Sequence, residues 1–367
     1  MFSLVAYFIS FSIGYLCLRL IRDYSQVNHR NNDSFMHIII SLPIGLGISS
    51  FISFYSIIFF HRVHKSVFLL FNLAVFIILL FVNRRRKVMN RCIDTSFISK
   101  NGVLIGIVSL ILFFVFVKML PLFVKYPYGF WDALSTWNLR PRFLLVSDNW
   151  TRAFSSLMWA SDYPLHLPLT ILWGWLLEGG DSVIAPIALA IIYTFLIVGL
   201  LYYSLNRYYG NSASTLMTLF LVFTPSFLDV VIMQYADIVL SCYNFYGGVC
   251  CYFALKEKRL DYMVFAQAAL GVAIFTKKEG LLFFIFLNIF MLCYLLWHDK
   301  RFLRRIWPTL LIPLFSILTL MIFRNIIAPP QEMFFKGSIP WALFLKKTQE
   351  FFGFIVPAIF QARQWSL

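Results

Sequence analysis

The sequence predicts an all-α polytopic membrane protein with about 10–11 transmembrane helices. Hydrophobic residues make up 60% of its 367 residues and charged residues only 13%, and the mean hydropathy is +0.79. A soluble domain carries about 25% charged residues. The apolar residues also lie in blocks of about 20, the length that a helix needs to cross a bilayer. These two observations exclude a soluble enzyme and a disulfide-rich secreted domain.

The apolar blocks give the elements in order. The first block has no basic stretch before it, which favours an uncleaved span over a removable signal peptide. Residues 165–177 are too short to span, and Pro164 precedes Trp173 and Trp175 there, which predicts an interfacial helix on the outer surface. Spans are expected at about 2–21, 36–60, 66–82, 103–124, 183–204, 212–229, 235–255, 262–277, 280–297 and 306–327, with an incomplete one from about 351.

The formal net charge of +15 is concentrated in short loops between the spans. Basic runs at 84–87, 256–259 and 300–305 mark the cytoplasmic side, so we expect no nucleic-acid partner. Only the short loop that contains Arg62 and Lys65 runs against this assignment. Alternation then places 84–101, 256–261 and 298–305 in the cytoplasm, and 125–165, 178–181, 229–237 and 277–279 on the extracytoplasmic face of a plasma (inner) membrane.

Acidic residues gather in the segments assigned to the outer face. Asp132 lies between Trp131 and Trp137, and an aromatic setting can desolvate a carboxylate and make it a better base. The alternative, that Asp132 caps the following helix, fits the sequence equally well. Asp162 lies further along the same loop, and Asp237 lies in the first turn of a span, where the helix dipole favours an anion.

Basic residues on this acidic face indicate a bound anion. Lys277 and Lys278 stand between two apolar helices, against the positive-inside bias, and an unpaired lysine in this position favours a phosphate ligand. Arg140 and Arg142 flank Pro141, where they either bind phosphate or extend to the lipid interface.

Four motifs together resemble a known family. They are WDALSTWNLRPRF at 131–143, DYPL at 162–165, QYADI at 234–238 and TKKEGLL at 276–282. In this order they resemble bacterial multi-pass glycosyltransferases of the GT-C fold, which include protein O-mannosyltransferases and aminoarabinose transferases. The resemblance covers roughly residues 103–327.

The resemblance implies an integral-membrane enzyme that takes a sugar from a polyprenyl phosphate on the extracytoplasmic side. It assigns Asp132 as the essential carboxylate and Asp162 as the second acidic position. The donor phosphate would contact Lys277, with Arg140 and Lys278 nearby. The acceptor is a lipid, glycan or protein, the remaining partners are membrane lipids, and the only cofactor the resemblance allows is a divalent cation. Further substrate-contacting candidates are Trp131, Trp137, Tyr163, His166, Gln234, Tyr235, Asp237 and Glu279.

The resemblance also divides the chain. Residues 1–102 are expected to form N-terminal transmembrane helices and a basic cytoplasmic loop, and 103–327 a GT-C-like catalytic core with its outer loop at 125–165. Residues 328–367 are expected to form an outer loop and an incomplete hydrophobic segment. Two alternatives stay open: a membrane transporter or lipid flippase, which would carry charges near mid-span, and a catalytically inactive GT-C-like assembly factor.

Overall fold

The computed structural model describes residues 2–24, 34–85, 96–154 and 161–328, with Lys346, Gln349, Glu350 and Gly353. The regular structure in these segments is entirely helical, and eight helices are long and apolar enough to cross a membrane. The predicted all-α polytopic class is therefore confirmed. Most of the segment expected at 328–367 lies outside the described residues, as do 86–95 of the basic loop.

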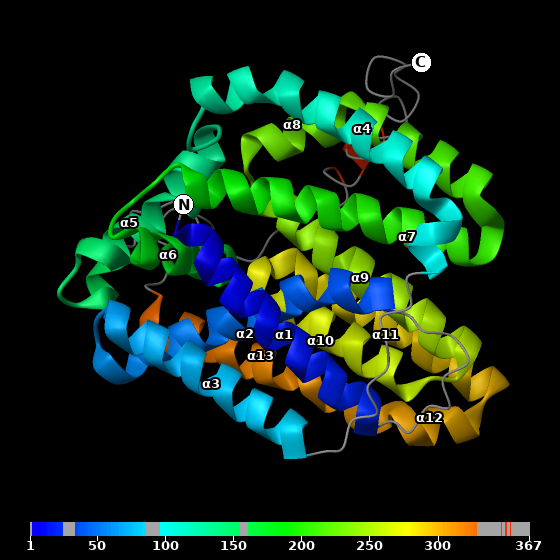
Figure 1. The fold of residues 1–367 in the computed structure, drawn as a ribbon. Coiled ribbons are helices and arrows are strands. Elements are labelled where there is room, and N and C mark those ends of the chain that lie inside the picture. Colours follow the sequence, from blue (N-terminus) through cyan, green and yellow to red (C-terminus); the bar gives the residue numbers. More distant parts are fainter. Residues whose placement is uncertain are drawn as a thin grey trace.

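The helices form one elongated bundle with their axes running roughly along its length (Figure 1). Seven of the eight are α1 (Ser3–Tyr24), α2 (Ser34–Phe60), α3 (Lys65–Arg85), α4 (Ser96–Lys125), α7 (Ile184–Phe223), α9 (Ala236–Glu257) and α11 (Lys278–His298), and the eighth is the broken helical run Lys300–Ile327. Helix α10 (Leu260–Thr276) is apolar but has only 17 residues. The shorter helices are α5 (Leu139–Val146), α6 (His166–Glu178), α8 (Pro225–Met233), α12 (Lys300–Ile306) and α13 (Ile312–Ile322). Tighter or wider turns form η1 (Ala133–Trp137), η2 (Trp150–Ala153), η3 (Trp307–Leu311) and η4 (Phe323–Ile327).

The chain reverses inside α7, which contains one and a half of the expected spans. Gly210 adopts φ 81° and ψ 179° there, a backbone conformation that glycine reaches without steric cost. The chain then returns beside the start of α7, because Phe227 and Val231 line the same small cavity as Ile191 and Phe195. The sequence expectation of two antiparallel spans, at 183–204 and 212–229, agrees with this arrangement.

The loops of the bundle gather at two ends. The acidic end carries 126–132, 161–165, 178–181, 234–237 and 277–279, and in Figure 1 it lies at the left, with α5 and α6. The basic end carries the reversal inside α7 and the α9–α10 and α11–α12 connections, with α12 at the lower right of Figure 1. The short α2–α3 connection, which runs against the charge-based assignment, lies at the acidic end, where the Trp150 amide donates to the His61 carbonyl at 3.2 Å. At the acidic end the amide of Ser3 donates to the Glu178 carboxylate at 2.9 Å.

At the basic end the ion pairs join neighbouring connections. Arg207 pairs with Glu257 at 2.9 Å, and Lys258 pairs with Asp299 at 2.9 Å. These contacts tie the reversal inside α7 to the α9–α10 connection, and that connection to the α11–α12 connection.

The first two helices are integral to the bundle. An added Cβ at Gly14 would stand 1.9 Å from the Ser41 carbonyl oxygen, and one at Gly45 would stand 1.8 Å from the Ser10 carbonyl oxygen. Small residues let helix backbones approach this closely, which is how helices associate when lipid supplies no hydrophobic driving force. A hydrogen bond of 2.7 Å between Ser10 and Ser49 adds to the contact.

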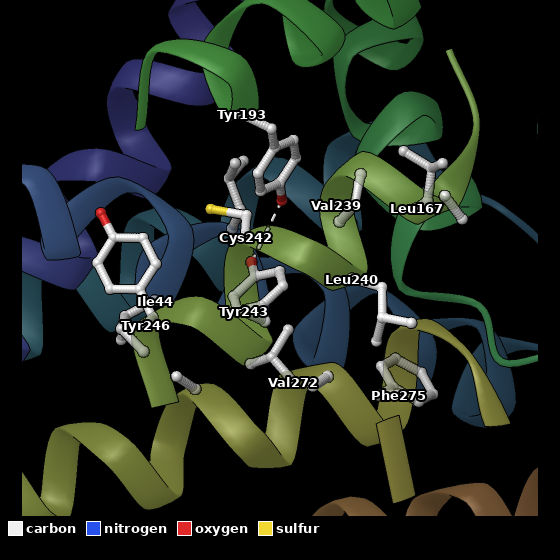
Figure 2. Close-up of a cluster of buried hydrophobic side chains, with 14 of the residues drawn as sticks. Ile44, Leu167, Tyr193, Val239, Leu240, Cys242, Tyr243, Tyr246, Val272 and Phe275 are labelled. Carbon is white, nitrogen blue, oxygen red and sulfur yellow. Dashed lines mark hydrogen bonds between the residues drawn. The ribbon is translucent and has the colours of Figure 1, made fainter. Parts of the chain in front are cut away.

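Two carbonyls around the proline inside α2 accept hydrogen bonds from tyrosines of α9. Pro43 lacks an N–H, so the Ile39 carbonyl loses its helical donor. The Tyr246 hydroxyl donates to that carbonyl at 2.9 Å, and the Tyr243 hydroxyl donates to the Pro43 carbonyl at 2.7 Å. Tyr243 also shares a 3.2 Å hydrogen bond with Tyr193 of α7 (Figure 2). These bonds fix α2, α7 and α9 relative to one another in an otherwise apolar core.

Helix α6 enters the bundle instead of lying on it. Its first residue, His166, bonds Ser50 of α2 at 2.9 Å and Tyr193 of α7 at 3.1 Å, two to three turns below the ends of those helices, on the order of 15 Å. Trp173 and Trp175 are completely buried, and their indole N–H groups donate to the backbone carbonyls of Ala6 and Ser182. The helix is too short to span, as expected, but its tryptophans contact protein instead of the lipid–water boundary.

Candidate active site

Four connections meet at the acidic end. The loop after α4 turns tightly at Gly129, where φ is +74°, and the amide of Phe130 donates to the Met233 carbonyl at 3.3 Å. The Gln234 side chain in turn donates to the carbonyls of Tyr126 and Pro127, at 3.5 and 3.4 Å. The loop that leads into the first motif and the start of the third motif, about 100 residues apart, are therefore joined by one backbone hydrogen bond and two bonds from the Gln234 side chain to backbone carbonyls.

Asp132 is held by hydrogen bonds to its carboxylate. The Trp137 indole N–H donates to Oδ2 at 2.9 Å, and the Thr136 hydroxyl donates to Oδ1 at 3.3 Å. Asp132 stands at the N-cap of η1 but makes no side-chain capping bond, so the helix-cap interpretation finds no support. The π-helical turn at Ala133–Trp137 points the tryptophan back at the carboxylate, and such turns are frequent at functional sites.

Trp137 and Arg140 connect this carboxylate to the second motif. The Trp137 ring stacks on Tyr163 with centroids 5.8 Å apart, and Nη1 of Arg140 donates to the Tyr163 carbonyl at 3.0 Å. Arg140 is completely buried. Burial lowers the pKa of Arg140 to about 10, while the charges of Asp162 and Asp132 oppose the shift. The guanidinium therefore remains charged at neutral pH and supplies a fixed positive charge between the two carboxylates.

Asp162 binds two cations from distant parts of the chain. Its Oδ2 lies 2.6 Å from Nζ of Lys278 and 3.5 Å from Nη2 of Arg324. The Lys278 ammonium also lies 5.0 Å from the Tyr163 ring centroid. Sequence reasoning missed Arg324. An arginine inside the apolar run at 306–327 was the available signal, because ionisable residues in spans are costly and usually functional.

Lys277 has carboxylate partners of its own. Its Nζ lies 3.0 Å from Oδ1 of Asp237 and 3.9 Å from Oε1 of Glu279. Burial lowers the pKa of Lys277, but the hydrogen bond and charge of Asp237 outweigh this and raise it overall. The premise that unpaired lysines on this face call for an anion is therefore wrong, because both lysines pair with carboxylates that lie far from them in the sequence.

The other candidates divide by exposure. Trp131 is 80% exposed, whereas Gln234 is 5% exposed and packs against the first loop. His166 is fully buried, with both ring nitrogens engaged, so the structure places it in the core. Tyr235 is partly exposed and Glu279 exposed. Arg142 pairs with Asp181 at 3.0 Å, away from Asp162.

The described residues offer little for a metal ion. They contain no group of three or more histidine, cysteine, aspartate or glutamate side chains that could hold one. Asp162 keeps one buried oxygen, Oδ1, without a hydrogen-bond partner. The site itself supplies two kinds of group. One is the partly exposed carboxylate of Asp132, and the other is the pair of cations Lys278 and Arg324, which can bind an anionic ligand.

Residues 163–323 match the family of dolichyl-phosphate-mannose-protein mannosyltransferases. The match covers less than half of the chain; it includes the lysine motif and ends beside Arg324, whereas Asp132 and Asp162 precede it. It indicates a membrane glycosyltransferase. Comparison with curated proteins and with solved structures gave no match.

Proposed function

We propose that this protein transfers a sugar from a polyprenyl-phosphate donor to an acceptor at the acidic end of the bundle, which faces the extracytoplasmic side of a plasma (inner) membrane. The observation that carries the proposal is the shared ion pair of Asp162 with Lys278 and Arg324, two exposed cations linked through Tyr163 and Trp137 to the Asp132 carboxylate. The cations can stabilise the negative charge of a phosphate ester, and the carboxylate can accept the proton of an acceptor hydroxyl.

Asp132 acts as the general base. In a direct displacement the acceptor oxygen attacks the anomeric carbon, the bond from that carbon to the phosphate oxygen breaks, and the acceptor proton passes to Asp132. The leaving phosphate carries away the electron pair. The indole N–H of Trp137 orients the carboxylate at 2.9 Å, so Trp137 is a positioning residue.

Lys278 and Arg324 hold the leaving phosphate. Their side chains are 38% and 49% exposed, whereas that of Lys277 is 11% exposed and already bonded to Asp237. Asp162 balances only one of the two positive charges, so the phosphodiester anion of the donor is attracted to both cations. The attraction increases during transfer, because the leaving phosphomonoester carries a second negative charge. This assignment moves the main phosphate contact from Lys277, which the motif favours, to its neighbour. Arg140 is buried and bonded to the Tyr163 carbonyl, so its positive charge acts on the phosphate without direct contact.

Transfer in proteoliposomes tests this proposal. Purified protein is given a radiolabelled polyprenyl-phosphate mannose, and mannosylated lipid, glycan and protein products are separated. The proposal predicts labelled product that forms without a nucleotide sugar and disappears in Asp132→Asn protein. Movement of the intact labelled lipid between leaflets, with no product, would instead favour the flippase alternative.

A further inference from the structure

A groove of about 450 Å³ runs along α9, with side chains of α7 and α11 as its walls. Figure 1 shows α9 between these two helices, and both pack against it. The volume is within the range of sites that bind small molecules. Leu205, Phe245 and Phe283, one from each helix, give the groove a largely apolar lining. On α9 the lining extends from Asn244 to Phe253, on the order of 13 Å at helical rise, so the groove suits a hydrocarbon chain that lies parallel to the helices.

A lysine held between two tyrosines stands at the basic end of the groove. Tyr208 and Tyr252 both line the groove, and Nζ of Lys256 lies 3.5 Å and 5.4 Å from the centroids of their rings. Lys256 donates to the Tyr252 hydroxyl at 3.1 Å, and the Tyr208 hydroxyl donates to Glu257 at 2.8 Å. An ammonium group has three N–H donors, so the tyrosines fix its position and still leave it able to bind a ligand.

The charge of Lys256 is not balanced, whereas the charges of its neighbours are. Arg207, Lys258 and Arg259 each pair with a carboxylate, at 2.9, 2.9 and 2.6 Å. Within the part of the chain that the structure describes, the printed contacts of Lys256 are with the two tyrosines alone. Its side chain is exposed. The mouth of the groove therefore carries a positive charge whose complement is an anion.

We propose that this groove binds an anionic phospholipid from the leaflet around the basic end, with the headgroup phosphate on Lys256 and an acyl chain along α9. Basic pockets between transmembrane helices are typical sites for anionic headgroups. The sugar donor is not this ligand. Lys256 and Asp237 lie at opposite ends of α9, about 30 Å apart at helical rise, and the proposed sugar transfer takes place at the acidic end. The inference therefore goes beyond the proposed function and does not depend on it.

The headgroup decides which lipid binds. Lipid tails are as apolar as the lining, so the acyl chain gains packing contacts and no hydrophobic burial. A neutral phospholipid can make the same chain contacts, but it has no net charge for Lys256 to attract. Because Tyr208 stands just before the reversal at Gly210, a lipid bound here contacts both α7 and α9 where the chain turns, and a ligand that binds only the folded protein stabilises it.

Two variants separate the headgroup contact from the chain contact. Lys256→Gln removes the charge, and Lys300→Gln, at an exposed lysine of the same end, is its control. Gly248→Leu places a side chain in the groove, because Gly248 lines it and no described atom lies within 4 Å of an added Cβ. Gly106→Leu, at an exposed glycine of α4 with the same open surroundings, is the matched control. Leucine favours a helix over glycine, so neither leucine variant should unfold the protein.

Native mass spectrometry of delipidated protein measures the Kd of phosphatidylglycerol and of phosphatidylcholine with the same acyl chains, and melting temperatures monitor folding. We expect the unmodified protein to bind phosphatidylglycerol about fivefold or more tightly than phosphatidylcholine. Lys256→Gln should remove this preference, and Gly248→Leu should weaken the binding of both lipids. Lys300→Gln and Gly106→Leu should behave like the unmodified protein.

Three results would overturn the proposal. Equal affinity of the unmodified protein for the two lipids, or a preference that survives Lys256→Gln, would show that Lys256 does not hold the headgroup. Unchanged binding in Gly248→Leu would place the chain outside the groove. Displacement of phosphatidylglycerol by glycerol 3-phosphate at equal concentration would identify a site for free phosphate instead of a lipid. Lipid binding is measured without sugar transfer, so failure of the proposed function would leave these results unchanged.

Discussion

Nζ of Lys278 lies 2.6 Å from Oδ2 of Asp162, and the same oxygen lies 3.5 Å from Nη2 of Arg324. One carboxylate is thus shared between two cations that come from different helices, so the group keeps one net positive charge. The residual charge stands beside Tyr163, at the acidic end of the bundle where the second and fourth sequence motifs meet. An anionic ligand is the natural complement of this group.

Lys278→Ala and Arg324→Ala should each raise the KM for a lipid-phosphate donor by about tenfold or more, because each removes a charge-assisted contact worth about 1.5–3 kcal/mol. Lys300→Ala removes an exposed lysine at the basic end and serves as the control. Steady-state kinetics in proteoliposomes measure the effect. Donor KM values equal to those of the control would refute the assignment of the phosphate to these side chains.

Lys277→Ala should raise the donor KM less than Lys278→Ala does. Lys277 is committed to Asp237 at 3.0 Å, and its raised pKa keeps it protonated until the pH exceeds the ordinary lysine value. The stability that this pair contributes is therefore present at neutral pH and is lost as the pH rises through the folded-state pKa. A double-mutant cycle with Asp237→Asn should give a coupling below about 1 kcal/mol, because Asp237 is half exposed. A larger KM effect at Lys277 than at Lys278 would restore the motif-based assignment.

The sequence predicted the spans well, because a span is a local property. A run of about 20 apolar residues makes a helix whatever its neighbours, and even the reversal at Gly210 separates two spans that hydropathy had already divided. The partners of the lysines were not predictable in this way. Lys278 meets Asp162 across more than 100 residues, and Arg324 reaches the same carboxylate from η4, the turn that follows α13. Burial of Trp173 likewise depends on how α1 packs, which no local pattern records.

The orientation of the bundle can be measured with single cysteines in a background without native cysteines. Asp148→Cys and Lys300→Cys stand at exposed positions at opposite ends. A membrane-impermeant maleimide added to intact cells should label position 148 and not position 300, because basic loops remain in the cytoplasm. Labelling of both after permeabilisation is the control. The reverse pattern would place the site in the cytoplasm and contradict the proposed side of transfer.

Arg140→Met should destabilise the protein by about 1–3 kcal/mol, since it removes the donor to the partly buried Tyr163 carbonyl. Arg140→Lys should restore little, because lysine lacks the planar, multi-donor guanidinium and loses its charge more readily when buried. Arg142→Lys, at a partly exposed pair with Asp181, should change stability by less than about 1 kcal/mol. Melting temperatures in detergent compare the three. Full rescue by lysine would show that only the charge of Arg140 matters.

Asp132→Asn should abolish transfer while the protein remains folded. Asparagine keeps the size and an oxygen that can accept the Trp137 N–H at the position now 2.9 Å away, but it has neither negative charge nor basicity. Loss of a general base costs about 10²–10⁴ in rate. Thr136→Val removes only the weaker 3.3 Å bond and should lower the rate far less. Single-turnover rates with saturating donor isolate the chemical step, and melting temperatures monitor folding. Near-normal turnover in Asp132→Asn would make Asp132 structural and leave Asp162, with its unpartnered buried oxygen, as the leading candidate for the base.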